Sequence, residues 1–167
     1  VGDDWAERKE LQHLLVDASP EEDAVAHELA DVWLYPASGT SPYSGENKGL
    51  FPWTLAKAYL SSPPALVESV RNRIRTLGDE RTDAQQRERE ALDRLLTLAQ
   101  ASTAGSSAKI EKLVEYLKGI GVAKSSDTRA VIFSERVPTL LWLQEKLQTQ
   151  LGLKPEQVAV LHGGLSD

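Results

Sequence analysis

The sequence of 167 residues contains no cysteine and no methionine, and aromatic residues make up only 6% of it. Without cysteine the chain can form neither a disulfide framework nor a thiolate metal site. The spacing of its three histidines, His13, His27 and His162, matches no common metal-binding motif. No apolar run is long enough to cross a membrane and no signal-peptide pattern occurs, so a cytoplasmic location is expected.

Common catalytic motifs are missing as well. The sequence has no GxxxxGK[ST] phosphate loop, no GxGxxG turn, no GxSxG elbow and no HExxH pair. Carboxylates are plentiful near its start, but they follow an exposed helical pattern that pairs none of them for acid–base chemistry. The residues therefore identify no catalytic side chain, no cofactor-binding residue and no metal ligand.

What is present is the composition of a soluble globular protein, with 41% hydrophobic and 26% charged residues. The formal charge of −6 argues against bulk electrostatic binding to nucleic acid. However, residues 1–31 hold ten acidic and two basic residues, a net charge of −8, so the remainder carries about +2. A basic groove in the later part is thus compatible with the charge. Arg71, Arg73 and Arg75 could form a basic face on one helix, or could simply be solvated.

Both ends of the sequence favour a piece of a longer protein. It starts at Val1 without an initiator methionine. It stops at Ser166 and Asp167, residue types that are preferred helix N-caps, with no helix left to cap. A processed intact protein is the alternative.

Residues 1–104 predict a mainly helical region. The apolar run at 12–17 could add one strand near residues 11–17 that belongs to the sheet of the later domain. Ser-Pro pairs at 19–20 and 62–63 predict helix starts, because serine caps a helix and proline is favoured at its first position. The small residues at 101–107 form the best linker candidate, so we place the domain boundary between residues 104 and 105.

Residues 105–167 predict an α/β arrangement. The continuous apolar runs AVIF (130–133) and VAVL (158–161) are typical of strands buried on both faces, and residues 138–151 have the apolar spacing of a helix. Strand, helix and strand with short connections form a parallel βαβ unit. Ligands approach such sheets at the carboxyl ends of the strands. The candidate binding residues at these ends are Ser134, Glu135 and Arg136 on one side and His162, Gly163 and Gly164 on the other.

The first of these strand ends suits a phosphodiester backbone. The Ser134 hydroxyl and the amides of the following turn can donate to a phosphate oxygen, and Arg136 can reach the same anion. The helix that begins near Pro138 adds the partial positive charge of its N-terminus. The alternative is that Ser134 caps the turn while Glu135 and Arg136 are solvated.

The second strand end is open to two interpretations as well. His162 could contact a ligand, or it could be a hydrogen-bonded loop residue. Gly163 and Gly164 permit positive φ and the close approach of another backbone, which would suit a nucleic-acid strand or a tight turn.

Several segments, in order and spacing, resemble superfamily 2 helicases, most closely the SWI/SNF-type ATPases and their bacterial relatives. The opening of the second RecA-like lobe of that family is similar to three segments of this chain: residues 107–113 (SAKIEKL), 130–134 (AVIFS) and 158–164 (VAVLHGG). Upstream, residues 14–22 resemble the strand and helix that follow the first lobe, and residues 60–66 (LSSPPAL) resemble the "SSP.AL" element of the helical insertion.

The resemblance implies a helical inter-lobe region at 1–104 and the first part of a RecA-like lobe at 105–167. It implies a parent protein that uses ATP and Mg²⁺ to translocate along or unwind DNA or RNA, with the first RecA-like lobe as a partner in the same chain. Ser134, Glu135, Arg136, His162, Gly163 and Gly164 would then flank the nucleic-acid groove.

This chain alone is not expected to bind or hydrolyse ATP. The family's phosphate loop and its Asp-Glu motif belong to the first lobe, and its arginine finger lies later in the second lobe. Phosphoryl transfer needs all three together. The alternative function is a non-catalytic α/β protein-interaction module.

Overall fold

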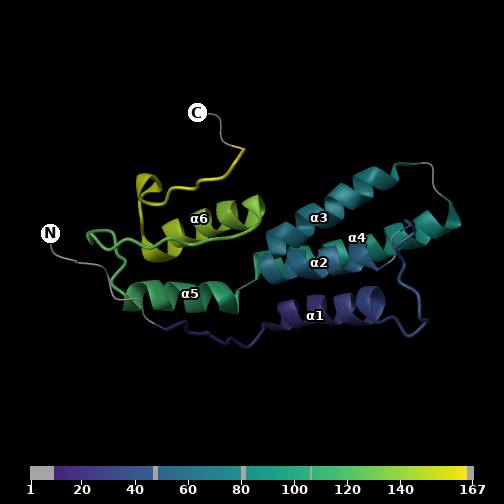
Figure 1. The fold of residues 1–167 in the computed structure, drawn as a ribbon, viewed down its shortest axis with the longest axis horizontal. Coiled ribbons are helices and arrows are strands. Elements are labelled where there is room, and N and C mark those ends of the chain that lie inside the picture. Colours follow the sequence, from purple (N-terminus) through teal and green to yellow (C-terminus); the bar gives the residue numbers. More distant parts are fainter. Residues whose placement is uncertain (1–9, 47–48, 80–81, 106, 165–167) are drawn as a thin grey trace.

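Figure 1 shows the computed structural model of the chain, which describes residues 10–46, 49–79, 82–105 and 107–164. Within these ranges all regular structure is helical. The elements are α1 (Pro20–Glu28) with its π-helical continuation η1 (Leu29–Leu34), α2 (Leu50–Ser61), α3 (Pro63–Leu77), α4 (Asp83–Ala104), α5 (Ala108–Gly119), α6 (Val137–Leu151) and the 3-10 turn η2 (Pro155–Gln157).

Serine caps fix the starts of α1 and α3, as the Ser-Pro pairs predict. The backbone N–H of Ser19 donates to the Glu22 carboxylate at 2.9 Å, and the N–H of Glu22 donates to the Ser19 hydroxyl at 3.2 Å. This reciprocal capping box satisfies two amides that the helix itself leaves without partners. At α3, the Ser62 hydroxyl accepts from the N–H of Ala65 at 3.2 Å. Both predicted helix starts are confirmed.

Helices α1 to α4 with η1 form one packed body, which we call the helical unit. Its core lies where α3 and α4 pack on each other, with α2 against α3, α1 against α4, and η1 against α1 and α2. Trp33, Leu66 and Leu92 are among the largest fully buried side chains. Burial of apolar side chains on this scale is the dominant stabilising contribution in a small domain.

The predicted linker is shorter than the small-residue run at 101–107 suggests. Helix α4 continues through Ala104, because Ala99 and Ser102 are buried and the Thr103 hydroxyl donates to the Ala99 carbonyl at 2.8 Å. Small residues here serve packing between helices rather than flexibility. The passage between α4 and α5 is therefore confined to residues 105–107.

Residues 107–164, which include α5 and α6, form a second body that we call the C-terminal unit. Figure 1 shows it at one end of the molecule, with the helical unit at the other. Its core is small, and consists of Ile110, Val114, Leu117 and Leu147 with a few partly buried neighbours. The two units meet where α6 contacts α3.

The predicted α/β fold class, with its incomplete RecA-like parallel βαβ sheet, is wrong. None of the described residues forms a strand, including the runs at 11–17, 130–133 and 158–161. The latter two runs are extended, but no backbone hydrogen bond joins them within the described ranges.

Their burial pattern gives the physical reason. A strand of a parallel sheet is covered on both faces. Ile132 packs against the C-terminal core, whereas Val131 and Phe133 on either side of it are 76% and 90% exposed. Leu161 at the end of the other run is 85% exposed. One face of each run therefore lacks a covering layer among the described residues.

Candidate nucleic-acid interface

A cluster of hydroxyl groups holds the two units together where α6 starts against the turn between α2 and α3. The Thr139 hydroxyl lies 2.7 Å from the hydroxyls of both Ser61 and Ser62. Thr139 and Ser62 are buried. Because buried hydroxyls are costly unless they are hydrogen-bonded, this cluster fixes the position of α6 on the helical unit. We call this region the junction. It comprises Ser61, Ser62 and Thr139 together with the residues described next, Ser69, Lys109, Ser134 and Arg136.

Ser134 and Arg136 bring the predicted polar turn to the junction. The N–H of Arg136 donates to the Ser134 hydroxyl at 3.3 Å, so Ser134 caps its own turn, as the alternative interpretation proposes. The Ser134 hydroxyl also lies 3.5 Å from that of Ser61. The partly buried Arg136 guanidinium donates to the Ser69 hydroxyl on α3 at 3.2 Å. Arg136 therefore bridges the two units instead of being merely solvated.

The remaining predicted site residues lie outside this bridge. Glu135 is exposed, and so are Gly163 and Gly164. The N–H of Gly164 donates to Nδ1 of His162 at 3.1 Å, which is the loop contact that the alternative interpretation describes. Neither glycine has a positive φ. Within the described ranges, no hydrogen bond or ion pair links the turn at 134–136 to residues 162–164.

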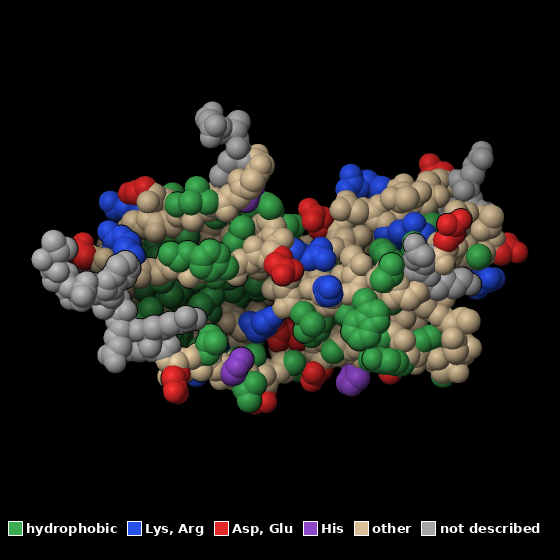
Figure 2. All heavy atoms as spheres, in the orientation of Figure 1, with side chains coloured by type: hydrophobic (Ala, Val, Ile, Leu, Met, Phe, Trp, Pro, Cys, Tyr) green, Lys and Arg blue, Asp and Glu red, His purple; other side chains and the backbone are tan. Residues whose placement is uncertain are grey.

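Lys109 is a second cation at the junction that the motif analysis did not assign to a site. Its ammonium group donates to the carbonyl of Leu60, the residue before the Ser-Ser-Pro-Pro turn, at 2.5 Å. Figure 2 shows Lys and Arg side chains near the middle of this face, between the two units, with acidic side chains beside them. In the sequence, the two adjacent serines at 61–62 could have indicated the junction, because a helix cap requires only one of them.

The three arginines of α3 do not act as one basic face. Arg71 and Arg75 are exposed, and both line a shallow hollow beside Glu68. Arg73 instead binds the fully buried Glu88 of α4 through two hydrogen bonds, Nε to Oε1 at 2.7 Å and a terminal nitrogen to Oε2 at 2.9 Å. Only two of the three predicted cations therefore remain open to solvent.

The Arg73–Glu88 pair is an internal anchor of the helical unit. The backbone N–H and the hydroxyl of Ser44 donate to Glu88 Oε2 at 3.0 and 2.5 Å, and the Arg73 guanidinium lies 4.6 Å from the centre of the Tyr43 ring. Burial by itself raises the pKa of Glu88, but the hydrogen bonds from Arg73 and Ser44 outweigh it and hold that pKa below its usual value. The hydrogen bond to Glu88 also raises the pKa of Arg73. This cluster ties the loop before α2 to α3 and α4.

Glu22 connects the start of α1 to the passage between the units. Its carboxylate accepts from the Ser107 hydroxyl at 3.1 Å, in addition to the Ser19 amide. The Tyr59 hydroxyl donates to the Glu22 carbonyl at 2.8 Å. Burial, followed by the nearby carboxylates of Glu22 and Asp23, raises the pKa of Tyr59. The interface between the units is therefore polar at two separate points.

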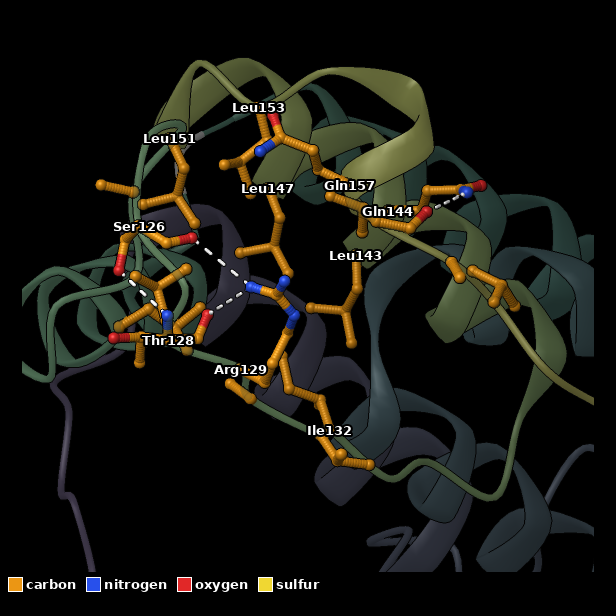
Figure 3. A pocket seen from close by; sticks show the side chains of 18 of the residues that line it. Ser126, Thr128, Arg129, Ile132, Leu143, Gln144, Leu147, Leu151, Leu153 and Gln157 are labelled. Atoms are coloured by element: carbon orange, nitrogen blue, oxygen red, sulfur yellow. Dashed lines mark hydrogen bonds between the residues drawn. The ribbon is translucent and has the colours of Figure 1, made fainter.

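The C-terminal unit contains an open apolar groove of about 800 Å³. Its floor is formed by Leu143 and Leu147 of α6, and its rims by the extended segments 129–134 and 158–161. Figure 3 shows the Arg129 side chain reaching over this floor from one rim. Figure 2 shows hydrophobic side chains gathered over the C-terminal unit, at the left of this view. The groove lies where the sequence predicts two adjacent strands of an incomplete parallel sheet.

No group of three or more histidine, aspartate or glutamate side chains is arranged to hold a metal ion within the described part of the chain. None of the described helices combines the length and apolarity that spanning a membrane requires.

Compared with known protein families, with curated proteins and with solved structures, the chain matches none of them.

Proposed function

We propose that this chain is a section of an ATP-driven helicase or translocase, and that its junction contacts the backbone of DNA or RNA. The observation that carries the proposal is the meeting of three segments on which the helicase resemblance rests. Lys109 binds the carbonyl of Leu60, and Ser134 lies beside Ser61. The segments 60–66, 107–113 and 130–134 are far apart in the sequence but come together at one polar surface.

The junction offers the chemistry that a phosphodiester backbone needs. Arg136 and Lys109 supply positive charge, and the hydroxyls of Ser61 and Ser134 supply donors. Such groups bind phosphate without reading base sequence. Arg136 has further N–H donors beyond the one that binds Ser69, so it can hold α3 and a phosphate oxygen together.

ATP and Mg²⁺ belong to the parent protein in this proposal, together with the first RecA-like lobe of the same chain. This section contributes binding surface and the connection between lobes, with no hydrolysis of its own. We place the parent protein in the cytoplasm, where a helicase or translocase acts on nucleic acid.

The test is the salt dependence of nucleic-acid binding by the full chain. Binding of fluorescein-labelled duplex DNA, single-stranded DNA and single-stranded RNA is measured by anisotropy over a range of salt concentrations. Arg136→Ala is expected to weaken binding and to lower the slope of log K against log salt by about 0.7–0.9, the value for one lost phosphate contact. Arg136→Lys keeps the charge and should retain most of the slope.

Lys118→Ala provides the matched control, because Lys118 is an exposed cation at the end of α5. An unchanged slope and affinity in Arg136→Ala would reject the proposed contact. An equal loss in Lys118→Ala would show that binding follows total charge and not the junction.

A non-catalytic protein-interaction module is the second candidate. The apolar groove of the C-terminal unit and the formal charge of −6 favour it, because an acidic chain attracts polyanions weakly. If none of the three nucleic acids binds at low salt, this second function replaces the first.

A further inference from the structure

The groove of the C-terminal unit has the features of a binding site for an extended peptide. Leu143 and Leu147 of α6 form its apolar floor, and two extended segments, 129–134 and 158–161, line its sides. Val131, Phe133 and Leu161 of these segments are largely exposed. A contiguous apolar surface of this kind marks a place where another molecule binds.

The backbone of both sides is open to a partner. Within the described ranges, no backbone-to-backbone hydrogen bond uses the amides or carbonyls of residues 130–133 or 159–161. Each of these residues offers one donor and one acceptor. An added polypeptide segment in extended conformation can pair with such groups, and in this mode the main-chain hydrogen bonds provide the affinity.

Arg129 adds a specific charge to this surface. Its guanidinium donates only to the carbonyls of Ser126 and Thr128, at 3.4 and 3.5 Å, and it has no ion pair among the described residues. Three other charged residues line the groove, Lys124, Asp127 and Glu156, and Lys154 lies 3.7 Å from Glu156. A carboxylate is the natural partner for Arg129, because the planar guanidinium binds it with two parallel hydrogen bonds.

We propose that the groove binds an extended, largely apolar peptide segment that carries one carboxylate. The segment lies between residues 129–134 and 158–161, pairs with their backbone groups, and places its carboxylate on Arg129. A fatty acid would satisfy the apolar floor and Arg129 but would leave the backbone groups of both sides without partners. The inference does not depend on the proposed contact with nucleic acid, since the groove and the junction share only Ser134, and Arg129 lies outside the junction.

The probe is a fluorescein-labelled peptide of about six residues, the length of an average strand, that consists of valine and isoleucine with one threonine and one aspartate. Matched peptides replace the aspartate with asparagine, or carry N-methyl groups on alternate backbone amides. Binding to the full chain is followed by anisotropy. We expect the aspartate peptide to bind about tenfold more tightly than the asparagine peptide, and the N-methylated peptide not to bind.

Arg129→Gln should remove the difference between the aspartate and asparagine peptides. Lys118→Gln makes the same charge change outside the groove and should preserve that difference. Arg129 is exposed, so this substitution is not expected to disturb folding, and the circular dichroism of both variants checks this. Equal binding of the two peptides to the unmodified chain, or no peptide binding at all, would overturn the proposal. Binding of dodecanoate without binding of any peptide would assign the groove to a lipid instead.

Discussion

The two units of this chain bury their apolar side chains to different extents. In the helical unit, thirteen hydrophobic residues form one buried core. The core of the C-terminal unit has four buried residues, and Val131, Phe133 and Leu161 around it remain exposed. The helical unit also pairs its most deeply buried charge, Glu88, with Arg73. Arg129 in the C-terminal unit has no such carboxylate among the described residues.

The difference follows from how each kind of backbone finds its hydrogen bonds. A helix satisfies its own amides and carbonyls and only needs to bury one apolar face. An extended segment satisfies few of its own and depends on a neighbouring strand. The helical unit is therefore complete in itself, whereas the extended segments 129–134 and 158–161 have no strand neighbour among the described residues.

The largest effect is expected when a leucine is truncated in the larger core, that of the helical unit. Leu92→Ala in α4 should lower the free energy of unfolding by about 4 kcal/mol, because Leu92 is fully buried and its truncation leaves a cavity in the core. Leu147→Ala in α6 should cost about 2 kcal/mol, because Leu147 lines the open groove. Hydrogen exchange measures both losses, since it reports the stability of each helix separately.

Each of these leucine variants serves as the control for the other, since both remove the same atoms from a helix. If Leu147→Ala proved as costly as Leu92→Ala, the C-terminal core would be as well packed as the helical one. The contrast between the two units would then be lost.

The next effect comes from the buried ion pair. Glu88→Gln should lower the stability of the helical unit by about 3 kcal/mol, because removal of one partner leaves the other without its counter-charge. Asp93→Asn is the matched control on the same helix, where the exposed Arg89–Asp93 pair has a distance of 2.9 Å. It should cost no more than about 0.5 kcal/mol. Urea denaturation of the two variants gives both values, and equal losses would contradict the role of Glu88 as an anchor.

The smallest effect is a dependence of stability on acid pH. The pKa of Glu88 is lower in the folded chain than its ordinary value of about 4.3. The unfolded chain therefore takes up the proton first as the pH falls. The contribution of Glu88 is complete above the ordinary pKa and is lost as the pH falls through the lower folded pKa.

This pH dependence can be assigned to Glu88 by comparison with its variant. Thermal unfolding between about pH 3 and 7 should show a shallower loss of stability in Glu88→Gln than in the unmodified chain. Identical slopes would mean that other carboxylates cause the acid sensitivity. The helical unit should show this effect more strongly than the C-terminal unit, in which no comparable buried carboxylate is found among the described residues.

Local signals in the sequence predicted the starts of α1, α3 and α6. Ser19 with Pro20, and Ser62 with Pro63, mark helix starts because caps act through atoms only a few residues away. The helix predicted at 138–151 agrees with α6 to within one residue at its start. The apolar runs at 130–133 and 158–161 are indeed extended, but their assignment to a sheet required partners that a local pattern does not specify.

The candidate site was predictable only in part. Ser134 and Arg136 stand out in the sequence as candidate binding residues, and both lie at the junction. The motifs did not select Ser61, Ser69 or Thr139, because their contacts are long-range. Ser61 meets Ser134 and Thr139, and Ser69 meets Arg136, across 67 to 78 positions of the sequence. From the sequence, Arg73 could belong to a basic face or be solvated, whereas in the structure the buried Glu88 of the next helix binds it.

The sequence by itself determined where α1, α3 and α6 begin, that α6 has an apolar face and that the runs at 130–133 and 158–161 are extended, because these properties depend on neighbours a few residues away. Only the tertiary structure decided which polar groups meet at the junction and that residues 129–134 and 158–161 border a groove. It also decided that Arg73 binds Glu88 instead of remaining in solvent. The physical reason is that hydrogen bonds between distant segments, and the coverage of an extended backbone, depend on how whole helices pack.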